Sequence, residues 1–428
     1  MLDRTRQPHI RPMRPFEIQH PSEHRMPNGI PVHVINSGDA EVVRLDIMIR
    51  GGQWEQERPL QATFTSRMLR EGTVHYSSAE IAENLDYYGA WLDVSSSMNY
   101  SFITLYSLNK YFSSTLPVVA SMLKEPVFPE KELSVVIEAN KQQYLVNREK
   151  VEVIARKKLN VNLFGESHPC ARYAVLEDYD KLTPDILRDM HSRFYHSGNC
   201  SCYLSGCVTD EMLSLLEKEL GQSEWGTQQT IPELTDICPQ GEKSKRVFIE
   251  RTDALQSAIR LGCFTLDDKH PDSLKLKLLI TLFGGYFGSR LMKNIREEKG
   301  YTYGISAGLV PYPFRNVFIV STQAANEYVC PIIEEVYREI DRLHNEKVPQ
   351  SELSMVKNYT IGDLCRTYES PFSLADAYIY LDTYGLKGDY FLRMQQEVLE
   401  TTAEDIMDLA RKYLRKDELT EVIAGKKM

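Results

Sequence analysis

The sequence predicts an α+β protein of two tandem homologous domains, each with a mixed or antiparallel sheet and helices packed on one face. Two observations predict this class: an internal repeat across most of the chain, and strands that group apart from long helices within each copy. The length of 428 residues agrees, because one hydrophobic core rarely extends over so long a chain. We therefore expect two separate cores.

Similar segments recur in the same order at a nearly constant spacing. The pairs are 128–136 with 348–356, 182–190 with 402–410, 203–206 with 422–425, and 43–48 with 259–264. Their spacings are 220, 220, 219 and 216 residues. Such regularity indicates a duplicated unit.

The repeat and the composition together predict the domain boundaries. An N-terminal arm covers 1–25, a first domain 26–221 and a second domain 246–428. Between the domains, residues 222–245 are rich in Ser, Gly, Thr and Gln, contain two prolines, and lack periodic structure. We interpret this stretch as the linker.

The first copy is expected to open with a strand, because residues 43–50 alternate apolar and polar side chains. A glycine pair ends this strand, and a helix follows Pro59. Residues 80–92 carry apolar side chains at helical spacing with a stop at Gly89, which predicts a second helix. Alternation and β-branching at 100–106 predict the next strand.

The helix after Pro59 includes residues 62–73, which read ATFTSRMLREGT. It resembles the zinc helix of the M16 metallopeptidases (pitrilysin, insulinase and mitochondrial processing peptidase), roughly AHFLEHMLFKGT, with its H-x-x-E-H motif. The two histidines fall on Thr63 and Arg67, and the glutamate on Ser66. These residues supply neither zinc ligands nor a general base. The resemblance therefore implies an M16 scaffold without its metal.

In this family a third ligand, a glutamate, lies on a later helix, seven residues after another acidic residue. The candidate helix is 130–147, and counting from Glu132 places Ala139 at the ligand position. Glu138 is adjacent, so a shift of one residue would bring a carboxylate there. A solvated helix face is the simpler interpretation of Glu138.

A second motif lies at 282–303 and resembles a signature of the second M16 half, with Arg296, Gly300 and Tyr303. In the family this Arg/Tyr pair holds substrate carbonyl oxygens near the scissile bond. A guanidinium and a phenol both donate hydrogen bonds and would stabilise a developing oxyanion. The alternative is structural: Arg296 paired with a neighbouring glutamate and Tyr303 in a strand core.

Composition excludes other function classes. A net charge of −10 with no basic domain argues against nucleic-acid binding. No apolar run is long enough for a membrane span, and no signal peptide is recognised. Eight scattered cysteines indicate free thiols in a reducing, cytoplasmic setting. His75, His191 and His196 have no companion at ligand spacing, and all ten histidines, including His168, are expected to be structural or exposed.

These features lead to a functional hypothesis. The resemblance implies a non-catalytic, peptide-binding subunit that pairs with a zinc-bearing sister subunit as a heterodimer, forming a clamshell chamber around peptide substrates. Zinc is expected in the partner and no cofactor in this chain. A homodimer, a purely structural or peptide-binding homologue without a peptidase role, and a self-sufficient metallopeptidase are the alternatives.

Overall fold

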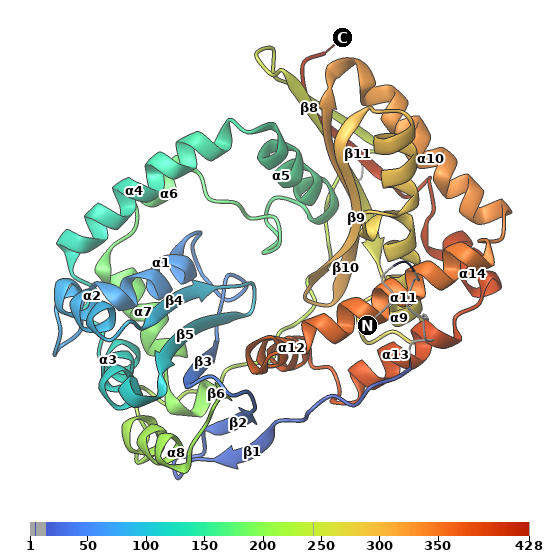
Figure 1. Cartoon of the computed structure of the whole chain (residues 1–428). Coiled ribbons are helices and arrows are strands. Elements are labelled where there is room, and N and C mark those ends of the chain that lie inside the picture. The colour runs from blue at the N-terminus through green and yellow to red at the C-terminus, as the bar shows by residue number, and fades with distance from the viewer. Residues whose placement is uncertain (1–4, 6–13, 243, 428) are drawn as a thin grey trace.

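The computed structural model describes residues 5, 14–242 and 244–427 and shows two halves, each built around one sheet (Figure 1). The first sheet has the order β1 (Ser22–Arg25), β2 (Pro31–Asn36), β6 (Cys200–Gly206), β3 (Val42–Arg50), β5 (Tyr100–Leu108) and β4 (Trp91–Ser96). The second has the order β7 (Arg246–Glu250), β11 (Thr420–Gly425), β8 (Gln256–Thr265), β10 (Arg315–Ala325) and β9 (Thr302–Tyr312).

The two sheets share one topology, which confirms the predicted pair of homologous α+β domains. In the first sheet β2 pairs parallel with β6, and the remaining pairs of β6, β3, β5 and β4 are antiparallel. In the second, β7 pairs parallel with β11, and β11, β8, β10 and β9 pair antiparallel. Strand β1 is an addition at the edge of the first sheet, within the segment 1–25 expected as an arm. Residues 1–4 and 6–13 of that arm lie outside the described residues.

Helices follow the same order in each half. The first half contains α1 (Gln61–Met68), α2 (Ser78–Tyr87), α3 (Phe112–Lys124), α4 (Glu130–Arg148), α5 (Val151–Phe164), α6 (Leu176–Tyr179), α7 (Pro184–Phe194) and α8 (Asp210–Leu216). The second contains α9 (Ser273–Ile280), α10 (Val329–Asn345), α11 (Gln350–Thr367), α12 (Pro371–Tyr384), α13 (Tyr390–Glu400) and α14 (Ala403–Tyr413), with a short π-helix, η6 (Met292–Glu298), before β9. None of the described helices combines the length and apolarity needed to cross a bilayer.

One element differs from its predicted extent. The helix expected over 80–92 spans Ser78–Tyr87. Ser77 caps its start, because the Glu80 amide donates to Ser77 Oγ at 3.3 Å and the Ser77 amide donates to Glu80 Oε2 at 2.8 Å. After Gly89, which has a left-handed φ of 62°, the chain enters β4 at Trp91. A strand therefore occupies the end of the stretch that sequence periodicity assigned to a helix.

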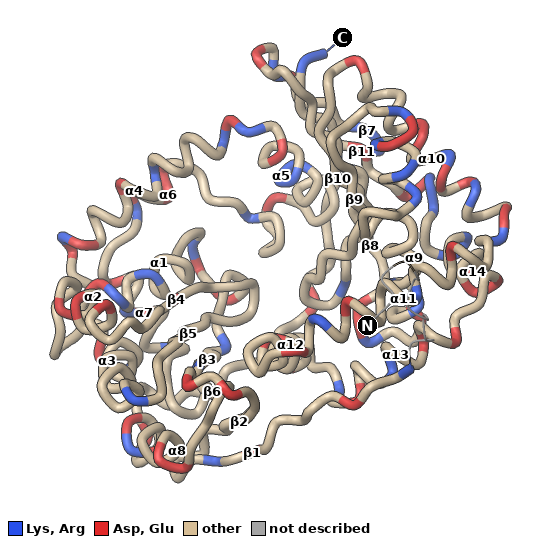
Figure 2. The backbone as a smooth tube through the Cα atoms, in the orientation of Figure 1, with Lys and Arg blue, Asp and Glu red and all other residues tan. Residues whose placement is uncertain are grey.

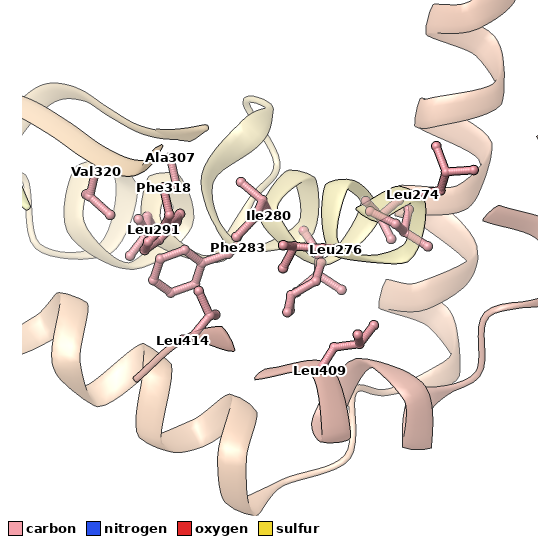
Figure 3. Packing of buried hydrophobic residues seen from close by; sticks show 14 of the residues in the cluster. Leu274, Leu276, Ile280, Phe283, Leu291, Ala307, Phe318, Val320, Leu409 and Leu414 are labelled. Carbon is pink, nitrogen blue, oxygen red and sulfur yellow. The ribbon is translucent and has the colours of Figure 1, made fainter. Parts of the chain in front are cut away.

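Each sheet packs against the helices of its own half on one face and against one helix of the other half on the opposite face. On β8, Ile259 and Leu261 belong to the second-half core, part of which Figure 3 shows around Phe283 and Phe318. The alternate residue Ala258 packs instead with Leu159 of α5, a first-half helix that lies against β8 and β11 (Figure 1). The internal repeat makes this arrangement reciprocal, because α12, which corresponds to α5, packs on β6 and β2.

The reciprocal packing explains the polar residues of β3. Arg44 and Asp46 lie on the face that α12 covers and are 6% and 1% exposed. Arg44 Nε lies 2.7 Å from Asp46 Oδ2, its Nη1 donates to the Phe372 carbonyl at 3.1 Å, and its Nη2 pairs with Asp376 of α12. The alternation that predicted a half-buried strand therefore belongs to a strand that is buried on both faces.

The N-terminal segment also links the halves. The Phe16 amide donates to Gln395 Oε1 of α13 at 2.8 Å, and Gln395 Nε2 donates to the Phe16 carbonyl at 3.1 Å. From there the chain crosses to β1 at the edge of the first sheet (Figure 1). Charges of both signs are distributed over both halves (Figure 2).

Candidate functional site

The degenerate metal helix, α1, is held by its apolar face. Ala62, Phe64 and Met68 are buried in the first-half core. Ser66 is also buried, and its Oγ lies 3.2 Å from the Tyr195 hydroxyl. Thr63 is half-buried. The hydroxyl at the family's glutamate position is therefore engaged within the protein interior.

Arg67 is exposed and connects α1 to α4. Its Nη1 donates to Asn140 Oδ1 on α4. The neighbouring Ala139 is exposed, and Glu138 pairs with Lys141 at 3.0 Å. An amide–guanidinium contact thus joins the two helices that in the family carry metal ligands, and it keeps a permanent positive charge there.

The donor chemistry at this position does not suit zinc. Zinc sites in proteins use Cys, His, Asp or Glu, whereas α1 offers Thr63, Ser66 and Arg67. Over residues 5, 14–242 and 244–427, no group of three or more such ligand residues is placed to hold a metal ion. The side chains of α1 therefore do not fit a zinc ion.

His168 has an internal role. Its Nδ1 accepts a hydrogen bond from the Cys170 amide at 3.2 Å, so its Nε2 carries the proton and donates to the Ile237 carbonyl at 3.1 Å. Burial lowers the pKa of His168, which agrees with a neutral ring. Both ring nitrogens are occupied, and the ring packs against Trp54 and Phe164.

The Arg/Tyr motif is built by a π-helix and a glycine turn. In η6, Asn294 and Ile295 point inward and are buried, which leaves Arg296 at the surface. Gly300 adopts a left-handed φ of 67°, which only glycine takes without strain, and lets the chain reverse into β9. As a result, Arg296 Nε donates to the Tyr303 carbonyl at 2.9 Å.

The remaining donors of the pair face solvent. The Arg296 guanidinium lies 4.5 Å from the centroid of the Phe287 ring, and Tyr303 is 95% exposed. Neither the terminal guanidinium nitrogens of Arg296 nor the Tyr303 hydroxyl has a hydrogen-bond partner among the described residues. Within the same residues, Glu297 and Glu298 form no ion pair with Arg296. Tyr303 is therefore not part of a strand core, and the internal contacts of Arg296 are those with the Tyr303 carbonyl and the Phe287 ring.

Arg296 and Tyr303 line an open depression of about 580 Å³, together with Gln256, Thr302 and Gln323. The depression lies where β8 and β9 begin and β10 ends. Free guanidinium and phenol donors at such a surface can bind carbonyl or carboxylate oxygens.

The two motifs lie in different halves. Helix α1 packs with α7 and β4 of the first half, whereas η6 packs with β9 and α10 of the second. Among the described residues, no hydrogen bond or ion pair connects Thr63, Ser66 or Arg67 with Arg296 or Tyr303. Sequence reasoning missed Asn140, which carries no motif signal, and Phe287, which lies inside the second motif.

Two family profiles match the chain in succession. The profile for "Insulinase (Peptidase family M16)" matches residues 32–168, and that for "Peptidase M16 inactive domain" matches residues 181–360. The chain belongs to the M16 peptidase family. The matches place α1 in the first profile and the Arg/Tyr motif in the second.

Relatives of this M16 protein carry different descriptions. A Helicobacter pylori protein described as "Non-peptidase homolog YmxG" is 23% identical over 379 residues, covering 86% of this chain and 84% of the relative. A Bacillus subtilis protein described as "Uncharacterized zinc protease YmxG" is 22% identical over 348 residues, covering 80% and 83%.

Solved structures share the fold. A Pseudomonas fluorescens structure of a "peptidase M16 inactive domain" has a TM-score of 0.83 at 21% identity and covers 95% of this chain and 98% of its own. A Helicobacter pylori protease structure has a TM-score of 0.87 at 16% identity and covers 96% and 100%.

Proposed function

We propose that this M16 protein is a non-catalytic subunit that pairs with a zinc-bearing sister subunit and supplies Arg296 and Tyr303 to bind peptide substrate. The observation that carries the proposal is that both side chains keep free donors at an open depression, although α1 of the same chain has no ligands for zinc. The relative described as a non-peptidase homologue supports the non-catalytic part.

The division of roles follows from the chemistry. A hydrolytic M16 site needs a metal-bound water and donors for the carbonyl oxygen. This chain offers donors without the metal, so the sister subunit would supply zinc and the general base. We further propose a heterodimer in the reducing cytoplasm, in agreement with eight cysteines that are all free thiols.

The sister subunit must also cover the site. Tyr303 is 95% exposed in the single chain, where water competes for its hydroxyl. A well-organised oxyanion donor contributes about 2.7–4 kcal/mol, roughly a hundredfold or more in rate, in a water-excluded site. Tyr303 should therefore lose exposure when the complex forms.

The test uses the sister subunit purified with and without this chain. Wild-type protein should raise peptidase activity, and Arg296→Ala or Tyr303→Phe should remove most of the gain while the complex still forms. Arg393→Ala and Tyr87→Phe are matched controls, because they change an exposed arginine on α13 and an 81%-exposed tyrosine on α2. A double variant that stimulates as well as wild type would refute the proposal.

A further inference from the structure

A second cavity, of about 430 Å³, lies where the two halves of the chain meet. Its walls include Arg50 and Tyr100 from β3 and β5 of the first half, Glu233 from the connecting stretch, and Tyr384 from α12 of the second half. The volume is within the range of about 300–1,000 Å³ that is usual for ligand pockets. A molecule bound here would contact both halves and the connection between them.

Acidic side chains outnumber basic ones in the cavity wall. The charged residues are Glu233, Asp267, Asp268 and Asp382 against Arg50 and Lys269. Arg50 keeps its positive charge, although one of its donors is occupied, because its Nη2 donates to the Pro232 carbonyl at 2.5 Å. Asp268 is neutralised by Lys277 at 3.0 Å, whereas Glu233 has no hydrogen-bond or ion-pair partner within the described part of the chain. With Asp268 neutralised, Glu233, Asp267 and Asp382 remain against Arg50 and Lys269, a small excess of negative charge that favours a cation over an anion.

Aromatic rings form much of the remaining wall, namely those of Tyr100, Tyr312, Phe314 and Tyr384. Phe314 has a φ of 70°, a left-handed conformation that bulky residues rarely adopt. It closes the turn between β9 and β10 and packs against Trp54 of the first half, with ring centroids 5.9 Å apart. Ring faces attract ammonium and guanidinium groups, so these walls and the acidic residues select the same kind of ligand.

One buried polar group in the wall lacks a partner. Asn99 is 8% exposed and lines the cavity, yet its side-chain amide makes no hydrogen bond to any described residue, and its Oδ1 is shielded from solvent. Buried amides in folded proteins nearly always have partners. A ligand with several N–H donors would satisfy this oxygen after a small adjustment, and a guanidinium has five.

We propose that this cavity binds the basic side chain of a peptide, an arginine or a lysine. The assignment gives a substrate class to the peptide-binding role and rests on the proposed function only in taking the ligand to be a peptide. Glu233 supplies the charge, the aromatic rings supply the walls, and Asn99 accepts a hydrogen bond. Because the cavity is separate from the depression at Arg296 and Tyr303, it would fix the register of a substrate rather than contact its scissile bond.

The test measures binding to the full-length chain by calorimetry, with N-acetyl-arginine methylamide as the probe and its citrulline analogue as the neutral isostere. The arginine probe should bind at least about fivefold more tightly than the citrulline probe. Glu233→Gln should weaken arginine binding by about two- to fivefold, as expected for one exposed charge pair. Lys269→Met, which removes a competing cation, should strengthen it.

Glu242→Gln is the matched control, since it makes the same charge change in the connecting stretch away from the cavity and should leave binding unchanged. Equal binding of the two probes, or equal loss in both glutamate variants, would overturn the inference. The outcome is independent of the proposed function. A chain that ignores the arginine probe but still activates a sister subunit refutes only this site, and the reverse result refutes only the subunit role.

Discussion

Arg44 allows a sharp test of how the two halves hold together. Its side chain and that of Asp46 are 7% and 2% exposed, and only Asp376, the partner on α12, is largely solvated. Arg44→Met leaves Asp46 buried with one remaining hydrogen bond, from Thr104 Oγ1 at 2.7 Å. Breaking a buried pair by removing one partner costs about 3–5 kcal/mol, so the free energy of unfolding should fall by that amount.

The matched variants separate charge burial from packing. Asp376→Asn removes the exposed partner and should cost about 0–1 kcal/mol. The double variant Arg44→Met, Asp46→Leu removes both buried charges, so it should recover most of the loss of the single variant, except for about 1 kcal/mol from the Thr104 hydroxyl left without an acceptor. Urea unfolding followed by circular dichroism and fluorescence measures these differences, provided that the two transitions coincide.

The same variant should show a defined pH dependence. Burial raises the pKa of Asp46 above its ordinary value of 3.8, and Arg44 opposes that shift. Without Arg44 the folded-state pKa rises further, so the folded variant holds a proton that the unfolded chain has released. The stability lost relative to wild type should be smallest near pH 4 and should grow as the pH rises toward 8. A loss below about 1 kcal/mol at pH 8, or one independent of pH, would refute the reasoning.

Three further outcomes are expected. Purified alone, the chain should contain no stoichiometric zinc by elemental analysis, and about one zinc per chain would contradict the alignment of α1. Gly262→Ala should destabilise the protein by about 1–3 kcal/mol and increase hydrogen exchange in α5. The reason is that the new Cβ would lie 3.0 Å from Leu159 Cδ2 and 3.0 Å from the Phe318 carbonyl oxygen. Gly308→Ala is the control, because a Cβ at position 308 has open space around it. Gln395→Ala should release the segment around Phe16 and speed its proteolysis, which mass spectrometry would detect, whereas unchanged cleavage would show that these hydrogen bonds are dispensable.

The residues of both motifs could be identified from the sequence because each motif is local. Thr63, Ser66 and Arg67 occupy one short helix, and their chemistry excludes zinc wherever the helix lies. Arg296 and Tyr303 are seven residues apart, and the π-helix and Gly300 that join them are encoded in the same segment. The sequence of this motif did not determine whether the Arg296 guanidinium pairs with a neighbouring glutamate, because that pairing depends on side-chain packing.

The fold class, the repeat and the location of both motifs were thus available from the sequence by itself, since periodicity and internal spacing record secondary structure and duplication directly. The tertiary structure decided which surfaces meet. Alternation along β3 gives Arg44 and Asp46 the pattern of a solvated face, yet α12 covers them from a point more than 300 residues away. The cavity around Asn99 likewise combines residues of the first half, the connecting stretch and the second half. Contacts of this kind depend on how complete domains dock, and the residue pattern within one strand does not identify the distant element that packs on it.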